Sequence, residues 1–306
     1  MKVFLTGATG YIGLAVGRAL VQARHQVTGL TRSPSRRDEL AAAGISPWVG
    51  DLRRPDSYNA EAGKAEAVVH AGFESGPEAA VVERRAVETL LACCRRGDEP
   101  RLFVYTSGVW VLGPRRDLDA DETSALAPLP NVAWRPEVER IVLDAAGGSV
   151  STVVLRPGCV YGGEGGLYGM MLASLRERGV IPLVGDGANC WASVERDDLA
   201  ELYRRVLEKR PSRQVYHATD GSAEPIRDVA RAFIAAAGGG KTETVPLARA
   251  LQEMGPFAEA LAMDQRVSSD KARRELGWRP QVASASSAAA ALLEQCRLRP
   301  ADHPIA

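Results

Sequence analysis

The sequence predicts an α/β fold in which a parallel β-sheet is covered by helices on both faces and is followed by a smaller α/β region. Short runs rich in Val, Ile and Leu alternate with longer stretches of helical spacing, which is typical of β-α-β units. The composition is that of an ordinary globular protein, since 45% of the 306 residues are hydrophobic and 25% are charged. These proportions exclude a disordered or low-complexity chain.

Strands and helices are expected in alternation along the first half of the chain. Buried apolar runs bounded by turn residues predict strands at 2–6, 26–30, 45–49, 67–70, 102–106 and 152–155. Amphipathic spacing predicts helices between them, at 11–24, 35–43, 77–96 and 132–146. Right-handed crossovers between such elements give a doubly wound sheet of the Rossmann type.

The first turn of this pattern is rich in glycine. Residues 6–13 read Thr-Gly-Ala-Thr-Gly-Tyr-Ile-Gly, directly between the first strand and the first helix. In this context Gly7 makes the tight turn, Gly10 lets the backbone approach a pyrophosphate, and Gly13 lets the helix pack on the strand. The turn therefore predicts a dinucleotide site, with contacts from Gly7, Thr9, Gly10, Tyr11 and Ile12. The alternative is a tight β-α turn without a ligand.

The residues after the second strand predict which dinucleotide is bound. A site for NAD usually carries an acidic residue there, which accepts a hydrogen bond from the ribose 2′-hydroxyl. Here the position is basic, with Arg32 first and Arg36 second as ligands of a 2′-phosphate. The sequence therefore predicts NADP(H), the alternative being a solvated basic start to a helix.

A glycine cluster at 162–166 divides the chain. We expect a dinucleotide-binding Rossmann domain at 1–163, with a return segment near 188–220, and a mostly substrate-binding region at 164–306. Within that region, the Ala- and Ser-rich stretch 283–293 is predicted to be one helix.

Charge and cysteine content exclude several classes of partner. The 38 basic and 38 acidic residues balance, so the chain lacks the basic excess that nucleic-acid binding requires. No apolar run approaches the roughly 20 residues that span a membrane. The five cysteines show no metal-ligand or disulfide pattern. Without features of a signal peptide at its start, the protein is expected to be soluble and cytoplasmic, with no metal.

Seven motifs in order resemble the short-chain dehydrogenase/reductase superfamily, in its extended branch of NAD-dependent epimerases, dehydratases and reductases. They run across nearly the whole chain: TGATGYIG (6–13), GDL (50–52), VVHAG (68–72), VYTSG (104–108), LRPGCVYG (155–162), RDDLA (196–200) and RRELGWRP (273–280). The resemblance implies that the adenine lies beside Asp51 and Leu52, the ribose beside Ala71 and Gly72, and the nicotinamide beside Pro157 and Gly158. It also implies a possible homodimer through helices 77–96 and 132–146.

The catalytic positions depart from this family. Its members usually carry a Ser or Thr together with a YxxxK motif, but Asn131 and Arg135 stand where that Tyr and Lys belong. Asn cannot transfer a proton near neutral pH, and Arg is a permanent cation. The hydroxyl position falls on Gly108, one residue after Ser107. The chain therefore resembles atypical members, in which the usual triad is replaced.

Several residues remain candidates for catalysis. The catalytic candidates are Ser107, Asn131, Arg135 and Tyr161. Of these, Arg135 is also a candidate anchor for the ribose or the substrate. The proton that accompanies hydride transfer would then come from Tyr161, Tyr168, His70 or water. Alternatively, Tyr161 is a packed aromatic residue, His70 is a core residue and Arg135 is an exposed helix arginine.

The predicted lining of the cleft favours an apolar substrate. Nucleotide-sugar members usually place an Arg after a GDG turn, and Trp191 stands there instead. Large apolar side chains are expected around the cleft, namely those of Trp110, Trp134, Tyr168, Met170 and Met171. We therefore predict an NADP(H)-dependent oxidoreductase that reduces a carbonyl or conjugated C=C bond of a mostly apolar small molecule. The alternative function is an NADP(H)-binding sensor without turnover. The third interpretation is a nucleotide-sugar epimerase or dehydratase.

Overall fold

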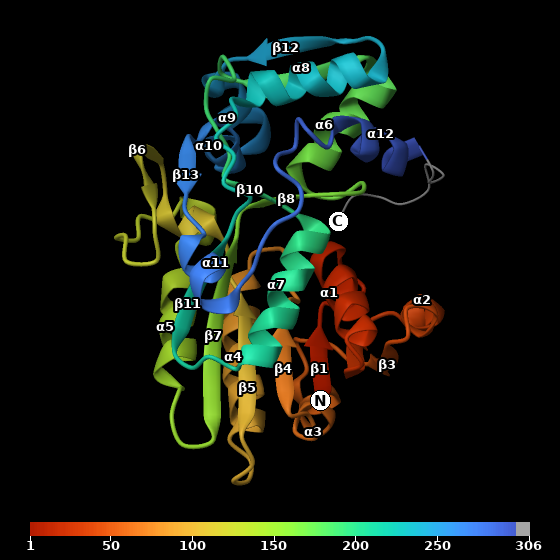
Figure 1. Cartoon of the computed structure of the whole chain (residues 1–306), viewed down its shortest axis with the longest axis vertical. Coiled ribbons are helices and arrows are strands. Elements are labelled where there is room, and N and C mark those ends of the chain that lie inside the picture. Colours follow the sequence, from red (N-terminus) through yellow and green to blue (C-terminus); the bar gives the residue numbers. More distant parts are fainter. Residues whose placement is uncertain (298–306) are drawn as a thin grey trace.

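The structure, a computed structural model, describes residues 1–297 and contains a seven-stranded parallel sheet (Figure 1). The strand order is β11-β7-β5-β4-β1-β2-β3. The strands are β1 (Lys2–Thr6), β2 (Gln26–Thr31), β3 (Ser46–Val49), β4 (Ala67–His70), β5 (Arg101–Thr106), β7 (Val150–Pro157) and β11 (Gln214–Ala218). The order reverses between β1 and β4, and ligands of such sheets bind at the carboxyl ends of the strands at this point.

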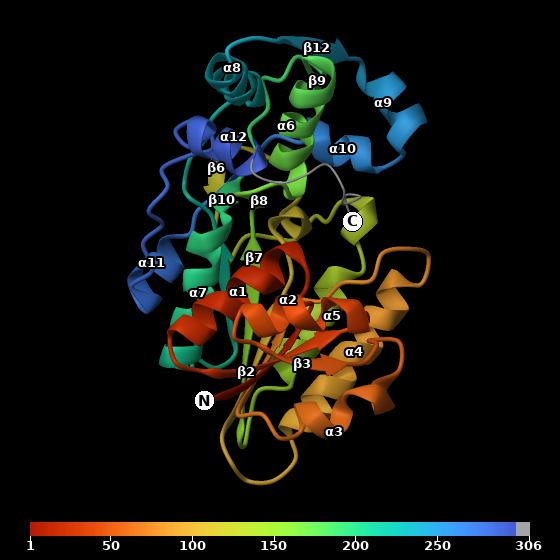
Figure 2. The same cartoon turned by 90° about the vertical axis from the view of Figure 1, so that its right-hand side faces the viewer.

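Helices cover both faces of the sheet, as Figure 2 shows. One face carries α1 (Tyr11–Gln22) and α7 (Arg196–Lys209), and the opposite face carries α4 (Ala79–Cys94) and α5 (Arg135–Asp144). The alternation of β1 explains this arrangement, because Val3 and Leu5 pack in one core cluster and Phe4 packs in the other. Shorter helical elements complete this lobe: η1 (Pro34–Arg36), α2 (Arg37–Ala42), η2 (Pro55–Ser57), α3 (Asn59–Ala62), η3 (Val109–Leu112), η4 (Pro130–Val132) and α11 (Asp270–Leu276).

A smaller lobe lies at the top of Figure 1 and has a core of its own. Tyr161, Tyr168, Trp191 and Phe233 are buried in this core. Its elements are α6 (Gly166–Arg178), β9 (Val180–Val184), α8 (Ile226–Ala237), β12 (Lys241–Val245), α9 (Leu247–Met254), α10 (Phe257–Ala262) and α12 (Ala289–Arg297). Short parallel pairs complete the architecture: β12 with β9, β8 (Cys159–Tyr161) with β10 (Ser193–Glu195), and β6 (Arg115–Ala120) with β13 (Gln265–Val267).

The α/β fold predicted from the sequence is confirmed, and the differences are local. The seventh strand, β11, lies in the segment near 188–220 that was expected to return to the first domain. The chain also returns a second time, because α11 packs on α7 and β11. No helix in residues 1–297 combines the length and apolar character needed to cross a bilayer.

The prediction of one helix over 283–293 is wrong in its first half. The helix begins at Ala289, after a turn. Ser284 and Ser287 exchange side-chain hydrogen bonds with each other's backbone N–H groups, at 3.1 and 3.2 Å. Serine side chains compete in this way with the helical hydrogen-bond pattern, so propensity summed over the Ala-rich stretch overestimates the helix.

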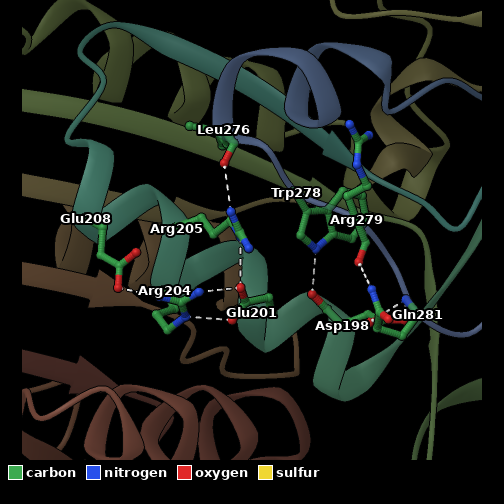
Figure 3. A network of polar contacts seen from close by, with 9 residues as sticks. All are labelled: Asp198, Glu201, Arg204, Arg205, Glu208, Leu276, Trp278, Arg279 and Gln281. Carbon is green, nitrogen blue, oxygen red and sulfur yellow. Dashed lines mark hydrogen bonds and ion pairs between the residues drawn. The ribbon is translucent and has the colours of Figure 1, made fainter.

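Helix α7 fastens the chain between α11 and α12 to the larger lobe (Figure 3). The backbone carbonyl of Asp198 accepts a hydrogen bond from Trp278 Nε1 at 2.8 Å, and its carboxylate accepts from the backbone N–H groups of Gln281 and Val282 at 2.9 and 3.0 Å. The Trp278 side chain is fully buried. Further along α7, Glu201 pairs with Arg205, whose Nη1 donates to the carbonyl of Leu276.

Candidate functional site

The glycine turn after β1 lies against the loop that follows β4. Gly7 has a φ of 67°, and a Cβ added there would lie 2.5 Å from the carbonyl oxygen of Ala71. A Cβ on Gly13 would lie 2.0 Å from the carbonyl oxygen of Gly7. Gly10 is the N-cap of α1, and the first turn of α1 carries no acidic residue. The Gly10 N–H donates to the carbonyl of Gly7 at 2.8 Å, but the first N–H groups of a helix have no intrahelical partner, so the start of α1 suits an anion.

The loop after β4 completes this edge of the site. The hydroxyl of Thr6 accepts a hydrogen bond from the backbone N–H of Gly72 at 3.0 Å. A Cβ on Gly72 would lie 3.0 Å from both Leu52 Cδ1 and the backbone nitrogen of Gly7. The structure thus brings together Gly7 of the glycine turn and Leu52, Ala71 and Gly72, the residues that the family resemblance assigns to the adenine and the ribose.

Other residues expected at the cofactor lie within this turn or after β3. Thr9 and Ile12 are half-buried, and the Tyr11 hydroxyl donates to the carbonyl of Gly162 at 2.7 Å. The Asp51 carboxylate accepts a hydrogen bond from the backbone N–H of Arg53 at 2.9 Å.

At the end of β7, a Cβ on Gly158 would lie 2.4 Å from the carbonyl oxygen of Ala192, so only glycine fits there. Its neighbour Pro157 lies close to Gly108, because a Cβ added to Gly108 would lie 3.8 Å from the carbonyl oxygen of Pro157. The carboxyl ends of β5 and β7 are therefore adjacent.

Two arginines converge on one carboxylate at the ends of β2 and β3. Arg32 Nη1 lies 2.5 Å from Glu74 Oε2, and Arg53 Nη2 lies 2.6 Å from Glu74 Oε1. Arg36, the second cation expected from the sequence, instead pairs with Glu39 at 2.7 Å. Sequence reasoning missed Arg53 and Glu74, although Arg53 directly follows the GDL motif. The Glu74 carboxylate stands where a phosphate oxygen pair could bind, so the residues at this edge fit a phosphorylated dinucleotide.

Ser107 follows the last residue of β5, and Arg135 is the first residue of α5. Ser107 Oγ is buried and has no hydrogen-bond partner among the described residues. Arg135 Nη1 donates to Thr106 O at 3.1 Å and lies 3.3 Å from the Tyr105 hydroxyl. The guanidinium also lies over the Trp134 ring, 4.6 Å from its centroid. Asn131 is exposed in η4.

The two tyrosines and the histidine that the sequence offers as proton sources are buried. Tyr161 is fully buried and donates to Asp220 Oδ2 at 2.9 Å, while the Tyr168 hydroxyl lies 2.6 Å from Ser193 Oγ. His70 is buried, with Nδ1 2.7 Å from the Thr6 hydroxyl. These side chains therefore take part in core packing, and a catalytic role for Tyr161 stays a prediction.

The lining of the cleft also differs from expectation. Tyr168, Met171 and Trp191 belong to the core of the smaller lobe, and the Trp191 indole N–H donates to Leu261 O at 3.1 Å. The smaller lobe needs large apolar residues for its own core, and the sequence alone does not separate these from cleft residues. Other aromatic side chains do group near Arg135 or between the lobes. The Trp134 ring stacks parallel to Phe73, and Trp110 meets Phe257 edge to face.

Two hollows of about 620 and 800 Å³ lie away from this edge. The first lies between α7 and α12, and the second lies beside β11. The first is lined by several carboxylates, but Asp198 among them is already satisfied by backbone N–H groups. In residues 1–297, no three His, Cys, Asp or Glu side chains gather closely enough to hold a metal ion.

Comparison with known proteins identifies a family and a relative to which the chain is similar. The model of the NAD dependent epimerase/dehydratase family matches residues 3–218. The 2-alkyl-3-oxoalkanoate reductase of Stenotrophomonas maltophilia is 28% identical, with 92% of this chain and 96% of that protein covered.

Two solved structures share the fold. DesIV, a dTDP-glucose 4,6-dehydratase of Streptomyces venezuelae with NAD bound, has a TM-score of 0.83 at 23% identity, with 97% of each chain covered. The human epimerase family protein SDR39U1 with NADPH has a TM-score of 0.76, also at 23% identity, with 96% of this chain and 99% of that chain covered.

Proposed function

The chain belongs to the NAD-dependent epimerase/dehydratase family, and from this premise we propose that it is an NADP(H)-dependent oxidoreductase. Its substrate is a mostly apolar small molecule with a carbonyl or a conjugated C=C bond. The similarity to a 2-alkyl-3-oxoalkanoate reductase supports a reductase of carbonyl compounds that carry apolar chains.

The observation that carries the proposal is the pair of guanidinium groups, Arg32 and Arg53, that converge on the Glu74 carboxylate. They follow the ends of β2 and β3, where the adenosine ribose of a dinucleotide binds in folds of this type. Two arginines offer charge-assisted hydrogen bonds that match the oxygens of a 2′-phosphate. A hydroxyl in the same place carries no negative charge and gains no such charge-assisted pair from the two arginines.

Ser107 and Arg135 supply the chemistry that the chain itself brings to the reduction. Bound NADPH supplies a hydride to the substrate carbon. The Ser107 hydroxyl, which has no hydrogen-bond partner within residues 1–297, donates a hydrogen bond to the substrate oxygen. The permanent charge of Arg135 stabilises negative charge that develops there, or holds the ribose. The proton that completes the reduction, on oxygen for a carbonyl or on the α-carbon for a conjugated C=C bond, comes from water.

The environment of Arg135 supports an apolar substrate. Trp134 and Phe73 stack in parallel beside the guanidinium, and Phe73 is 52% exposed. An exposed aromatic surface next to a cation suits a molecule with one polar group and an apolar body.

Calorimetric titration with NADPH and NADH tests the cofactor. We expect NADPH to bind more tightly. Arg32→Ala should weaken NADPH binding about 10- to 100-fold with little effect on NADH, because it removes a charge-assisted hydrogen bond. Arg37→Ala, at an exposed arginine in α2, is the matched control for the loss of charge. Equal affinity for the two dinucleotides in the unaltered protein would contradict the assignment.

A second candidate function is an NADP(H) sensor without turnover, which the replacement of YxxxK by Asn131 and Arg135 favours. Loss of NADPH absorbance with a panel of ketones, enones and quinones separates the two. Turnover that Ser107→Ala lowers supports the reductase, whereas tight NADPH binding without turnover supports the sensor. Epimerisation of nucleotide sugars would contradict both.

A further inference from the structure

We infer that Glu74 is a built-in competitor of the 2′-phosphate and thereby sets the preference between the two dinucleotides. Its carboxylate binds Arg32 and Arg53, and the phosphate displaces it when the phosphorylated dinucleotide binds. This inference rests on the proposed function, because it concerns the same two arginines.

The burial of Glu74 is the first step of the argument. The Glu74 side chain is 13% exposed, whereas those of Arg32 and Arg53 are 60% and 51% exposed. The carboxylate thus lies inside the pair, and each of its oxygens receives one guanidinium. A ligand phosphate that binds both cations must enter the space that this carboxylate takes.

Charge decides whether the two anions can share the arginines. Two guanidinium groups and one carboxylate leave one positive charge, and a phosphate monoester near neutral pH carries close to two negative charges. Like charges a few ångströms apart near a protein surface repel strongly. Glu74 therefore has to move away, and this cost falls on the phosphorylated dinucleotide alone. The other form, which has only a 2′-hydroxyl, leaves the ion pairs intact.

The position of Glu74 allows this movement. It lies in the loop between β4 and α4, four residues after His70, and it belongs to no helix or strand. When Glu74 moves away, the phosphate takes its place on both guanidinium groups, so neither Arg32 nor Arg53 is left without an anion.

The test uses two nucleotides that differ only in the 2′-phosphate, 2′,5′-ADP and 5′-AMP, titrated calorimetrically into the full chain. Glu74→Gln should tighten 2′,5′-ADP binding about tenfold and leave 5′-AMP within about twofold. Glu253→Gln is the matched control, since it removes the same charge from an arginine pair, that with Arg249 in α9 of the smaller lobe. In an Arg32→Ala, Arg53→Ala background, Glu74→Gln should have no such effect. Thermal unfolding checks that each variant is folded.

The outcomes separate this inference from the proposed function. If the unaltered protein prefers 2′,5′-ADP but Glu74→Gln binds it no more tightly, the competitor role is overturned and the cofactor assignment stands. If the unaltered protein shows no preference and Glu74→Gln creates one, Glu74 is a competitor but NADP(H) is not the favoured cofactor. If neither protein prefers 2′,5′-ADP, both are overturned.

Discussion

Among single residues, Asp220 couples the core of the smaller lobe to pH. Its carboxylate accepts hydrogen bonds from the Tyr161 hydroxyl at 2.9 Å and from the backbone N–H of Ser222 at 2.7 Å. Burial nevertheless dominates and raises the pKa of Asp220 to about 6. Because the folded pKa lies above the unfolded one, the stabilising contribution of protonated Asp220 is complete below about pH 4 and is lost as the pH rises through about 6.

We therefore predict that Asp220→Asn removes part of the pH dependence of stability. Between pH 4 and 7, the free energy of unfolding of the unaltered protein should fall relative to that of the variant by up to about 3 kcal/mol. His217, whose pKa burial and Arg156 lower to about 3, has the opposite slope, but it is present in both proteins and cancels. Urea denaturation across this pH range measures the difference. Parallel stability curves for the two proteins would refute the prediction.

At the scale of elements, the first turn of α7 has two roles: it is capped by Glu195, and its Asp198 side chain binds another segment of the chain. Glu195 caps the helix by accepting hydrogen bonds from the N–H groups of Asp197 and Asp198, while the Asp198 carboxylate binds the segment before α12. Figure 3 shows that Asp198 points toward this segment. One helix therefore packs on α1 and also orders the chain between α11 and α12.

Asp198→Asn should lower the free energy of unfolding by about 1–3 kcal/mol, because an amide offers one acceptor oxygen where a carboxylate offers two to buried N–H groups. Chemical denaturation measures the loss. Asp197→Asn is the matched control in the same helical turn, since that side chain is 73% exposed and should change stability by no more than about 0.5 kcal/mol. An equal effect of both substitutions would show that Asp198 has no special role.

The elements that the sequence predicts well are those fixed by local pattern. The run from β1 through α1, with its glycine turn, depends on residues a few positions apart, and periodicity reveals them. Arg53 and Glu74 join the site only through strand pairing, since β3 and β4 lie on either side of the β1-β2 pair. Tyr168 was predicted to line the cleft, and the sequence alone could not show that it is buried. Its burial depends on Trp191 and on Phe233 of α8, which lie far from it in the sequence and pack edge to face on its ring.

For the whole molecule, α4 and α5 offer a continuous outer surface. Arg84 of α4 and Glu137 of α5 form an ion pair at 2.9 Å across the two helices, and Val81 of α4 is 69% exposed. A single exposed valine is common on protein surfaces, so the expectation of a dimer through these helices comes from the family resemblance. We propose a homodimer through these helices.

Light scattering should give twice the chain mass of 32.7 kDa. Val81→Asp should shift the protein to monomers, because it places a charge in the apolar part of the interface. Leu247→Asp, at an exposed position in α9 of the smaller lobe, should leave the mass unchanged. A monomer in the unaltered protein would rule out this interface.

The bond between Tyr11 and Gly162 bears on how the two lobes can move. The glycine cluster at 162–166 looks like a natural hinge, and three of its residues, Gly162, Gly163 and Gly166, have positive φ. Yet the Tyr11 hydroxyl holds Gly162, and a Cβ on Gly165 would lie 2.4 Å from the Tyr11 ring. The first helix therefore restrains this glycine cluster, and any movement of the two lobes about residues 162–166 would also move the glycine turn at residues 6–13.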